Sequence, residues 1–331
     1  MDELLFYCGE HQITQKVYGN CLFSVSSVNF VQILRMKGKR KIWHWLVLAA
    51  LSLIWGTSYI LMKKGLESFS TFQIGSLRII ITFLALLPVA IRNLPKLNRS
   101  NIISIAIIGF FGSGIPAFLF PLAQTRIDSS LAGMLNSLSP VFTLIIGIMF
   151  YQQNVIKSQI AGVFLGLVGA FGLLYSGSFT FNYYGLFVVL ATILYGISTN
   201  EVSKVQGLNG LHITSLAFFV LSPFAIILIL FTDIHAATET ANWVRNLGFI
   251  AILSVFGSAI ALALFYLLVR DTSPVFASMV TYFVPIIATL WGIADNEHLM
   301  PHLLVSVLLI LGGVYLIYRP GFLTKLRKKM T

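Results

Sequence analysis

The stretch NSLSPVFTLI, from Asn136 to Ile145, places a proline in the middle of a long apolar run. A second stretch, TYFVPIIATL from Thr281 to Leu290, does the same, and Pro140 and Pro285 are 145 positions apart. A proline inside a helix removes a hydrogen bond and collides with the carbonyl group four residues earlier, which costs about 3 kcal/mol. Two such interruptions at matching places indicate one element that occurs twice. They also predict freed carbonyl groups at Asn136 and Thr281.

Long apolar runs recur along the chain, of which 57% is hydrophobic and only 10% is charged. Soluble domains carry about 25% charged residues. A run of about 20 apolar residues crosses the hydrocarbon core as a helix, which satisfies its own backbone hydrogen bonds. We therefore predict an all-α membrane protein with ten transmembrane helices. The expected spans are residues 42–62, 73–91, 101–121, 128–150, 158–176, 184–204, 212–231, 245–269, 275–294 and 301–319.

The formal net charge of the chain is +11, and the basic residues gather in alternate loops. Basic clusters occur at residues 35–41, 92–99 and 325–329. Because cytoplasmic loops are rich in Lys and Arg, we expect a multi-pass protein of the plasma membrane with both termini in the cytoplasm. The lipid bilayer, through its anionic lipids, is a sufficient partner for these charges. No nucleic acid partner is expected.

The two ends of the chain differ from the apolar part between them. Residues 1–41 form a predicted cytoplasmic extension, and residues 320–331 form a basic cytoplasmic tail. The segment MKGKRKIWHW starts at Met36 with a methionine and a basic cluster, directly before the first span. We therefore expect residues 1–35 to be a start-site artefact or a disordered extension. Cys8 and Cys21 give no disulfide framework.

Several pairs of segments match between the two halves of the chain. FGSGI at residues 111–115 matches FGSAI at 256–260 with an offset of 145, and WGTSY at 55–59 matches YGIST at 195–199 with an offset of 140. We predict a first five-helix repeat at residues 42–176 and a second at 184–319. Because five is odd, the second repeat enters the membrane from the opposite side. Inverted-topology repeats are typical of secondary transporters, whose site lies near the membrane midplane between the halves.

The segment LSLIWGTSYILMKKGLESFSTFQIGSLRIIITFLALLP, from Leu51 to Pro88, resembles the opening of the EamA family of the drug/metabolite transporter superfamily. The likeness lies in the Trp-Gly pair, the lysine that ends the first span and the Leu-Arg that precedes an apolar run. It covers roughly residues 41–319, although many relatives have proline where Thr71 stands. The resemblance implies that the fifth and tenth helices are peripheral and that the other eight surround a central cavity.

Arg78 is the clearest charged residue within a predicted span. Charge within the bilayer is costly and is often functional. A guanidinium could bind a substrate carboxylate, although Arg78 could also have an architectural role or reach the interface. Glu201 lies near the end of the sixth span, where we expect it to pair with Lys204. We find no other carboxylate that would support a buried proton relay.

Further candidates for a substrate cavity are polar, aromatic or proline residues within the spans. Residues of these types also serve helix packing and the membrane interface, so each alone is weak. Trp55 and Tyr59 share a helix face, and so do Tyr195 and Thr199; the repeat-equivalence of these two sets favours them. The remaining candidates are Gln124, Asn136, Pro140, Thr281, Tyr282 and Pro285.

The motifs of other functional classes are absent from the sequence. We see no Walker A motif and no H-E-x-x-H motif, and His298 and His302 are separated by Pro301, so we expect no enzyme, cofactor or metal site. The leading prediction is a secondary transporter that exports amino acids or similar small-molecule substrates by alternating access. A nucleotide-sugar carrier is the alternative, and a membrane scaffold or sensor is a further one. Gly162 and Gly166 allow close helix packing within the chain or a homodimer.

Overall fold

A computed structural model describes residues 42–153, 155–174, 181–297 and 301–318 of the chain. This part forms helices and no β-strand. The predicted extension at residues 1–41, with Cys8 and Cys21, lies outside the described residues. His298 and the predicted tail at 320–331 also lie outside them.

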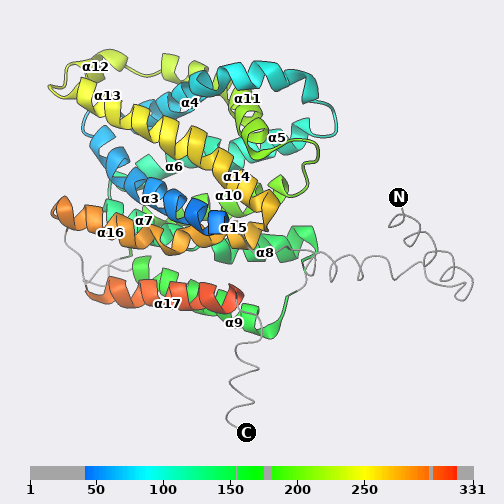
Figure 1. Ribbon diagram of the computed structural model, residues 1–331. Coiled ribbons are helices and arrows are strands. Elements are labelled where there is room, and N and C mark those ends of the chain that lie inside the picture. The colour runs from blue at the N-terminus through cyan, green and yellow to red at the C-terminus, as the bar shows by residue number, and fades with distance from the viewer. Residues whose placement is uncertain (1–41, 154, 175–180, 298–300, 319–331) are drawn as a thin grey trace, which may run out of the picture. The chain divides into compact units, whose positions relative to one another are not determined.

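Ten helical segments occupy the ten predicted spans (Figure 1). The first five are α3 (Ile42–Gly65); α4 (Thr71–Asn93); α5 (Ile102–Gly109) with η2 (Phe110–Gly114) and α6 (Ile115–Gln124); α7 (Ser129–Asn136) with α8 (Ser139–Tyr151); and α9 (Lys157–Leu174). The second five are α10 (Gly185–Val202); α11 (Gly210–Leu230); α13 (Trp243–Ile252) with η3 (Leu253–Ile260) and α14 (Ala261–Asp271); α15 (Pro274–Ser278) with η4 (Met279–Tyr282) and α16 (Val284–Ala294); and α17 (Pro301–Tyr318). A short helix, α12 (Ile234–Thr238), lies in the loop after α11.

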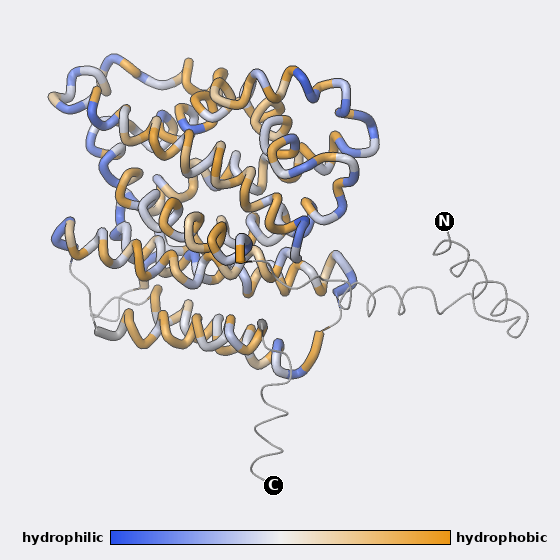
Figure 2. The backbone as a smooth tube through the Cα atoms, in the orientation of Figure 1, coloured by the Kyte–Doolittle hydropathy of each residue, from blue (hydrophilic) through white to orange (hydrophobic). Residues whose placement is uncertain are grey.

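Length and hydropathy support the membrane assignment. Within the described residues nine segments are long and apolar enough to cross a membrane, and α17 contains the shorter apolar stretch Leu303–Ile317. Hydrophilic residues gather in the loops that join the helices, whereas the helices are largely hydrophobic (Figure 2). The prediction of an all-α membrane protein of about ten helices is confirmed.

The second span of each half, α4 and α11, begins with a capping box. The Ser70 side chain accepts a hydrogen bond from the Gln73 backbone N–H, while the Gln73 side chain accepts one from the Ser70 N–H. Asn209 and His212 make the same reciprocal pair at the start of α11. Such boxes satisfy two backbone donors that a helix start leaves free. The two caps therefore give a common origin for comparing positions on α4 and α11.

The third and eighth spans each contain a π-helical segment in their middle. These segments are η2 and η3, and they include the matching motifs FGSG at residues 111–114 and FGSA at 256–259. A π-helical turn is rare and interrupts the regular rotation of side chains along a helix, often at functional sites. The sequence match predicted equivalent segments but not this geometry.

The fourth and ninth spans break just before their prolines, which corrects the expectation of a kink within a continuous helix. Pro140 is the second residue of α8, and Pro285 is the second residue of α16. The first backbone N–H groups of a helix have no partner within it, so a proline there sacrifices no hydrogen bond. The Asn136 carbonyl is not left free, because the Ser139 hydroxyl donates to it at 2.8 Å.

The fifth and tenth spans, α9 and α17, pack along each other at the edge of the bundle (Figure 1). A Cβ atom at Gly162 would meet the backbone carbonyl oxygen of Gly313, so the two backbones are in direct contact. Gly166 faces Val141 of α8, where an added Cβ would lie 2.8 Å from a methyl group. Both glycines therefore serve packing within this chain.

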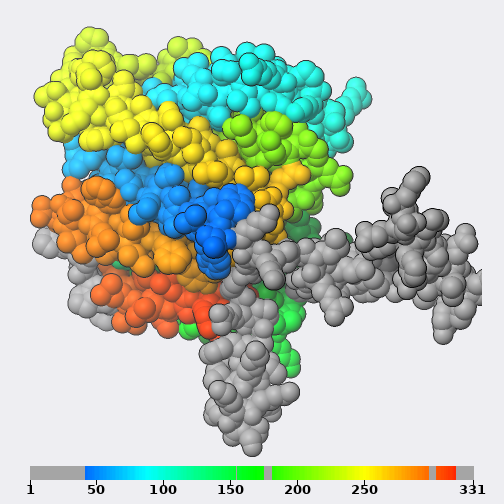
Figure 3. Space-filling model, viewed as in Figure 1, coloured from blue at the N-terminus to red at the C-terminus, as the bar shows by residue number. Residues whose placement is uncertain are grey.

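Helix α3 lies between α16 and the α13–α14 span on the face that Figure 3 shows. The Trp55 indole N–H donates to the Gly257 carbonyl at 2.9 Å, and the Trp291 indole N–H donates to the Thr57 hydroxyl at 3.0 Å. The Ser52 hydroxyl also donates to the Val280 carbonyl at 3.0 Å. The first helix of the first half is thus bonded to the eighth and ninth spans around the cavity described next.

Candidate functional site

A cavity lies within the bundle, with about 940 Å³ of space that no protein atom fills, part of it open to solvent. Its described lining comes from spans one to four and six to nine, and it includes no residue of α9 or α17. This arrangement agrees with the eight central helices and two peripheral helices that the family resemblance implies.

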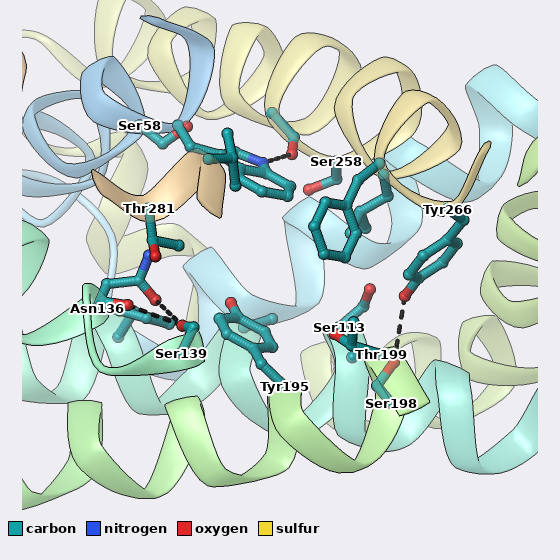
Figure 4. A pocket seen from close by; sticks show the side chains of 18 of the residues that line it. Ser58, Ser113, Asn136, Ser139, Tyr195, Ser198, Thr199, Ser258, Tyr266 and Thr281 are labelled. Atoms are coloured by element: carbon teal, nitrogen blue, oxygen red, sulfur yellow. Dashed lines mark hydrogen bonds between the residues drawn. The ribbon is translucent and has the colours of Figure 1, made fainter. Parts of the chain in front are cut away.

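Seven of the eleven candidate residues line this cavity. They are Trp55, Tyr59, Arg78, Asn136, Tyr195, Thr199 and Thr281. The other four lie beside it: the Gln124 amide donates to the Tyr59 carbonyl at 3.1 Å, Tyr282 packs against the hydrophobic core, and Pro140 and Pro285 are buried near the starts of α8 and α16. In the close view of Figure 4, Asn136 and Thr281 come from the two broken spans and lie next to each other at one side of the cavity.

Most residues that line the cavity form pairs, in which a residue of the first half matches a residue of the second half at one of the two repeat offsets. At an offset of 140 the pairs are Trp55 with Tyr195, Ser58 with Ser198, and Tyr59 with Thr199. At an offset of 145 they are Gly112 with Gly257, Ser113 with Ser258, Phe120 with Phe265, and Asn136 with Thr281.

Contacts are also exchanged between these pairs. A Cβ atom at Gly112 would meet the Ser198 hydroxyl, and one at Gly257 would lie 3.0 Å from the Ser58 hydroxyl. Gly112 corresponds to Gly257 in the repeat, and Ser198 corresponds to Ser58, so the two contacts join equivalent residues. A two-fold relation between the halves would produce such an exchange.

Aromatic rings form much of the cavity wall. The rings of Trp55 and Phe265 have centroids 5.2 Å apart, and the Phe120 ring lies 5.7 Å from Tyr59 and 5.9 Å from Tyr195. The bond from the Trp55 indole to the Gly257 carbonyl holds that ring in place. Such walls suit an apolar body, while the hydroxyl groups of Ser113, Ser198 and Tyr266 add polar contacts.

Arg78 is the one charged residue among the described residues that line the cavity. One of its terminal nitrogens lies 3.4 Å from the Ser258 hydroxyl, whereas its buried Nε has no hydrogen-bond partner. Tyr59 and Tyr195 line the same cavity as the guanidinium. A guanidinium has five N–H donors, so most of its hydrogen-bonding capacity remains available to a ligand.

The charge of Arg78 has no equivalent in the second half. Arg78 lies eight residues after Ser70, the N-cap of α4. The corresponding residue of α11, eight residues after its N-cap Asn209, is Ala217. The next positions, Ile79 and Phe218, both line the cavity. The cavity is therefore paired in shape but carries its positive charge on one side only.

A polar cluster surrounds Glu201 at the end of the sixth span. The Glu201 carboxylate pairs with Lys204 at 3.4 Å, as predicted, and it also accepts hydrogen bonds from Ser104 at 2.6 Å and Tyr151 at 2.5 Å. The sequence did not reveal these last two partners, which lie 97 and 50 positions away. With these partners Glu201 serves to hold spans three, four and six together, and it does not line the cavity.

A second polar cluster joins the end of α3 to the segment after α16. Lys63 pairs with Asp295 and Glu297 at 2.8 Å each, and Lys64 pairs with Asp295 at 2.8 Å. Burial by itself would raise the pKa of Glu297, but hydrogen bonds from Lys63, Ser129 and Ser130 lower that pKa to about 2. No group of three His, Cys, Asp or Glu residues in the described chain could hold a metal ion.

Sequence reasoning missed four serines that line the cavity. Ser113 and Ser258 stand at equivalent places in FGSGI and FGSAI, and Ser58 and Ser198 stand at equivalent places in WGTSY and YGIST. All four line the cavity. A small polar residue that recurs at a repeat-equivalent position was therefore the available signal, and it is stronger than the residue type alone.

Comparison with known proteins gives matches over most of the chain. The model of the EamA-like transporter family matches residues 41–175 and again residues 182–319. An uncharacterized transporter of Archaeoglobus fulgidus is 26% identical over 278 residues, which cover 83% of this chain and 98% of that protein. A probable amino-acid metabolite efflux pump of Salmonella typhimurium is 25% identical over 122 residues, which cover 37% of this chain and 39% of that protein. One solved crystal structure has the same fold, with a TM-score of 0.57 and 16% identity, over 83% of this chain and 96% of the other.

Proposed function

Because this chain belongs to the EamA-like transporter family, we propose that it exports amino acids or related small metabolites by alternating access at the central cavity. The observation that carries the proposal is the cavity itself, which is lined by four spans of each half. Transporters with internal repeats bind their substrates at such a place. A membrane scaffold would have no need for such a cavity. A small-molecule sensor would have one, but the family match favours transport.

The paired lining supports alternating access as the mechanism. Two arrangements, one open to each side of the membrane, have similar energies when the same contacts can form in either half. The exchanged contacts of Gly112 with Ser198 and of Gly257 with Ser58 are of this kind. We propose that the two inverted five-helix repeats move against each other around the cavity.

The choice of amino acids and related compounds over nucleotide sugars rests on charge. A nucleotide sugar has a diphosphate group, which calls for several cationic or N–H donors. Among the described residues that line the cavity, Arg78 is the only cation. The partial similarity to a probable amino-acid metabolite efflux pump points in the same direction. Nucleotide-sugar transport therefore remains the second candidate.

The proposed setting is the plasma membrane, with both termini in the cytoplasm. The basic clusters at residues 35–41, 92–99 and 325–329 support this orientation. A homodimer is a further proposal, for which Gly162 and Gly166 are not available because they pack within the chain.

The test is transport by the full chain reconstituted in liposomes of known orientation. Labelled amino acids, sugars and nucleotide sugars are each loaded or supplied, and their movement is compared with that in empty liposomes. We expect at least one amino acid or related acid to move faster than in the empty vesicles. Movement of nucleotide sugars alone would favour the second candidate, and movement of no solute by folded protein would contradict the proposal.

A further inference from the structure

The guanidinium of Arg78 stands in the cavity without a counter-charge. Among the described residues it approaches the neutral Ser258 hydroxyl at 3.4 Å, and its Nε is buried without a hydrogen-bond partner. Neither Asp nor Glu occurs among the described residues that line the cavity. A buried cation that lacks an anion is costly, and in membrane proteins such a group pairs with an opposite charge or with backbone carbonyls, or faces a water-filled cavity. The described lining supplies no such anion, so a bound ligand can supply it.

The same described lining offers a substrate cation ring faces and neutral acceptors but no counter-ion. An ammonium group would be in the same cavity as Arg78, with neutral hydroxyl, amide and carbonyl acceptors but no carboxylate. Hydrogen bonds between neutral acceptors and an ammonium give only part of the stabilisation of an ion pair. A substrate's amino group would therefore add little to binding, whereas its anionic group would add much.

The geometry of the walls indicates what the anion is attached to. Opposite the position of Arg78, the second half contributes the apolar Phe218 to the cavity lining, and the rings of Trp55 and Phe265 lie 5.2 Å apart in the wall. A ligand that matches this lining has a charged group at one end and an apolar body at the other. The planar fork of a guanidinium binds a planar carboxylate through two parallel hydrogen bonds.

We propose that the cavity recognises its substrate as a carboxylate, with Arg78 as the binding residue and the aromatic wall as the site of an apolar body. The amino group of an amino acid is then tolerated but not required. This inference rests on the proposed function, because it assigns the substrate class of the same cavity.

The experiment uses three probes that share one aromatic skeleton. Phenylalanine has both charged groups, 3-phenylpropionate has the carboxylate alone, and phenethylamine has the ammonium alone. Inorganic phosphate is the fourth probe and tests whether charge without an apolar body is enough. Binding is measured on the full chain in detergent as the rise in melting temperature over a range of probe concentrations, because a ligand that binds the folded state stabilises it.

We expect phenylalanine and 3-phenylpropionate to bind with affinities within about tenfold of each other and phenethylamine and phosphate to give no shift. Replacement of Arg78 by Lys keeps the positive charge but loses the planar guanidinium fork. We expect the affinity for 3-phenylpropionate to fall about tenfold or more. Arg78→Gln should abolish binding. The control is Arg126→Gln, at an exposed arginine outside the cavity, which should bind as the wild-type chain does.

The inference is overturned if phenethylamine binds as well as 3-phenylpropionate, if phosphate alone binds as well, or if Arg78→Lys binds with unchanged affinity. It is also overturned if phenylalanine alone binds, or if none of the probes binds. These outcomes are distinct from failure of the proposed function. Carboxylate binding that depends on Arg78, without movement of any solute in liposomes, would leave this inference in place and contradict transport.

Discussion

Lys63 and Glu297 are 234 positions apart in the chain and form an ion pair of 2.8 Å. The Glu297 side chain is only 1% exposed, and it also accepts hydrogen bonds from the Ser129 backbone N–H and hydroxyl and from the Ser130 backbone N–H. The carboxylate thus stands at the start of α7, where a helix favours negative charge. One buried side chain joins the end of the first span, the start of the fourth and the segment after the ninth.

Replacement of Glu297 by Gln should lower the stability of the protein by about 3 kcal/mol, because it removes one of the two carboxylate partners of Lys63 and the charged acceptor of the Ser129 and Ser130 hydrogen bonds. The measurement is thermal or denaturant unfolding in detergent. The matched control is Glu239→Gln, whose side chain is 69% exposed and pairs with His235. Exposed ion pairs contribute about 1 kcal/mol or less. Similar losses in the two variants would contradict the structural role of Glu297.

Stability should depend on pH through the same cluster. Burial alone would raise the pKa of Glu297, but its hydrogen bonds hold that pKa at about 2, below the ordinary 4.5. The pKa of Asp295 is also lowered, because hydrogen bonds from Lys63 and Lys64 outweigh its burial. A carboxylate with a depressed pKa contributes stability that is complete above its ordinary pKa and is lost as the pH falls through the folded-state value.

The prediction is that the stability difference between the wild-type chain and Glu297→Gln is constant above pH 5 and shrinks between about pH 4.5 and pH 2. Melting temperatures of both proteins across this range measure it. The comparison isolates Glu297 because the other titrating groups are common to both proteins. A difference that grows as the pH falls would have the wrong sign and would contradict the assigned hydrogen bonds.

Much of the fold could be predicted from local sequence, since hydropathy determines which segments cross a membrane and the ten spans follow from it. The Lys63–Glu297 pair could not be predicted in the same way. Both residues were recognisable as polar residues near span ends, but which ends meet depends on the packing of helices far apart in sequence. The π-helical segments and the break before Pro140 could not be predicted from the sequence for a related reason. The composition of a span does not reveal its local hydrogen-bond register.

The cavity was predictable where a residue was both chemically unusual and repeated. Trp55 and Tyr195 were found because their repeat-equivalence added to their residue type, and Arg78 was found by its charge. Gln124 was a candidate on type alone, and its amide instead donates to a backbone carbonyl. The serines at 113 and 258 were overlooked because serine in a membrane span is common. Repetition of a position is therefore a better guide to this cavity than residue type.

The contact between α9 and α17 should be sensitive to a single methyl group. An added Cβ at Gly162 meets the Gly313 carbonyl oxygen and lies 2.9 Å from the Ile317 backbone nitrogen. In the Gly162→Ala variant, α9 must therefore move away from α17. We expect a loss of about 1–3 kcal/mol in unfolding free energy. The control is Gly248→Ala in α13, where nothing lies within 4 Å of the added atom and alanine should stabilise the helix by up to about 1 kcal/mol. Losses of equal size at both positions would show that α9 and α17 are not in close contact.

Cysteines placed at Asn136 and Thr281 should react with a small, water-soluble thiol reagent, after Cys8 and Cys21 are replaced by serine. Both positions line the cavity, and a thiol reacts through its thiolate, which needs water or polar surroundings. A cysteine at Phe164 is the control, since that side chain is 71% exposed on α9, a helix that contributes nothing to the described cavity lining. We expect the lipid-facing control to react slowly and both cavity positions to react at least about tenfold faster. A saturating ligand should slow the two cavity positions together, because one cavity holds both side chains. Protection of one position without the other would mean that the broken fourth and ninth spans face separate spaces, and it would contradict a single pathway between the two halves.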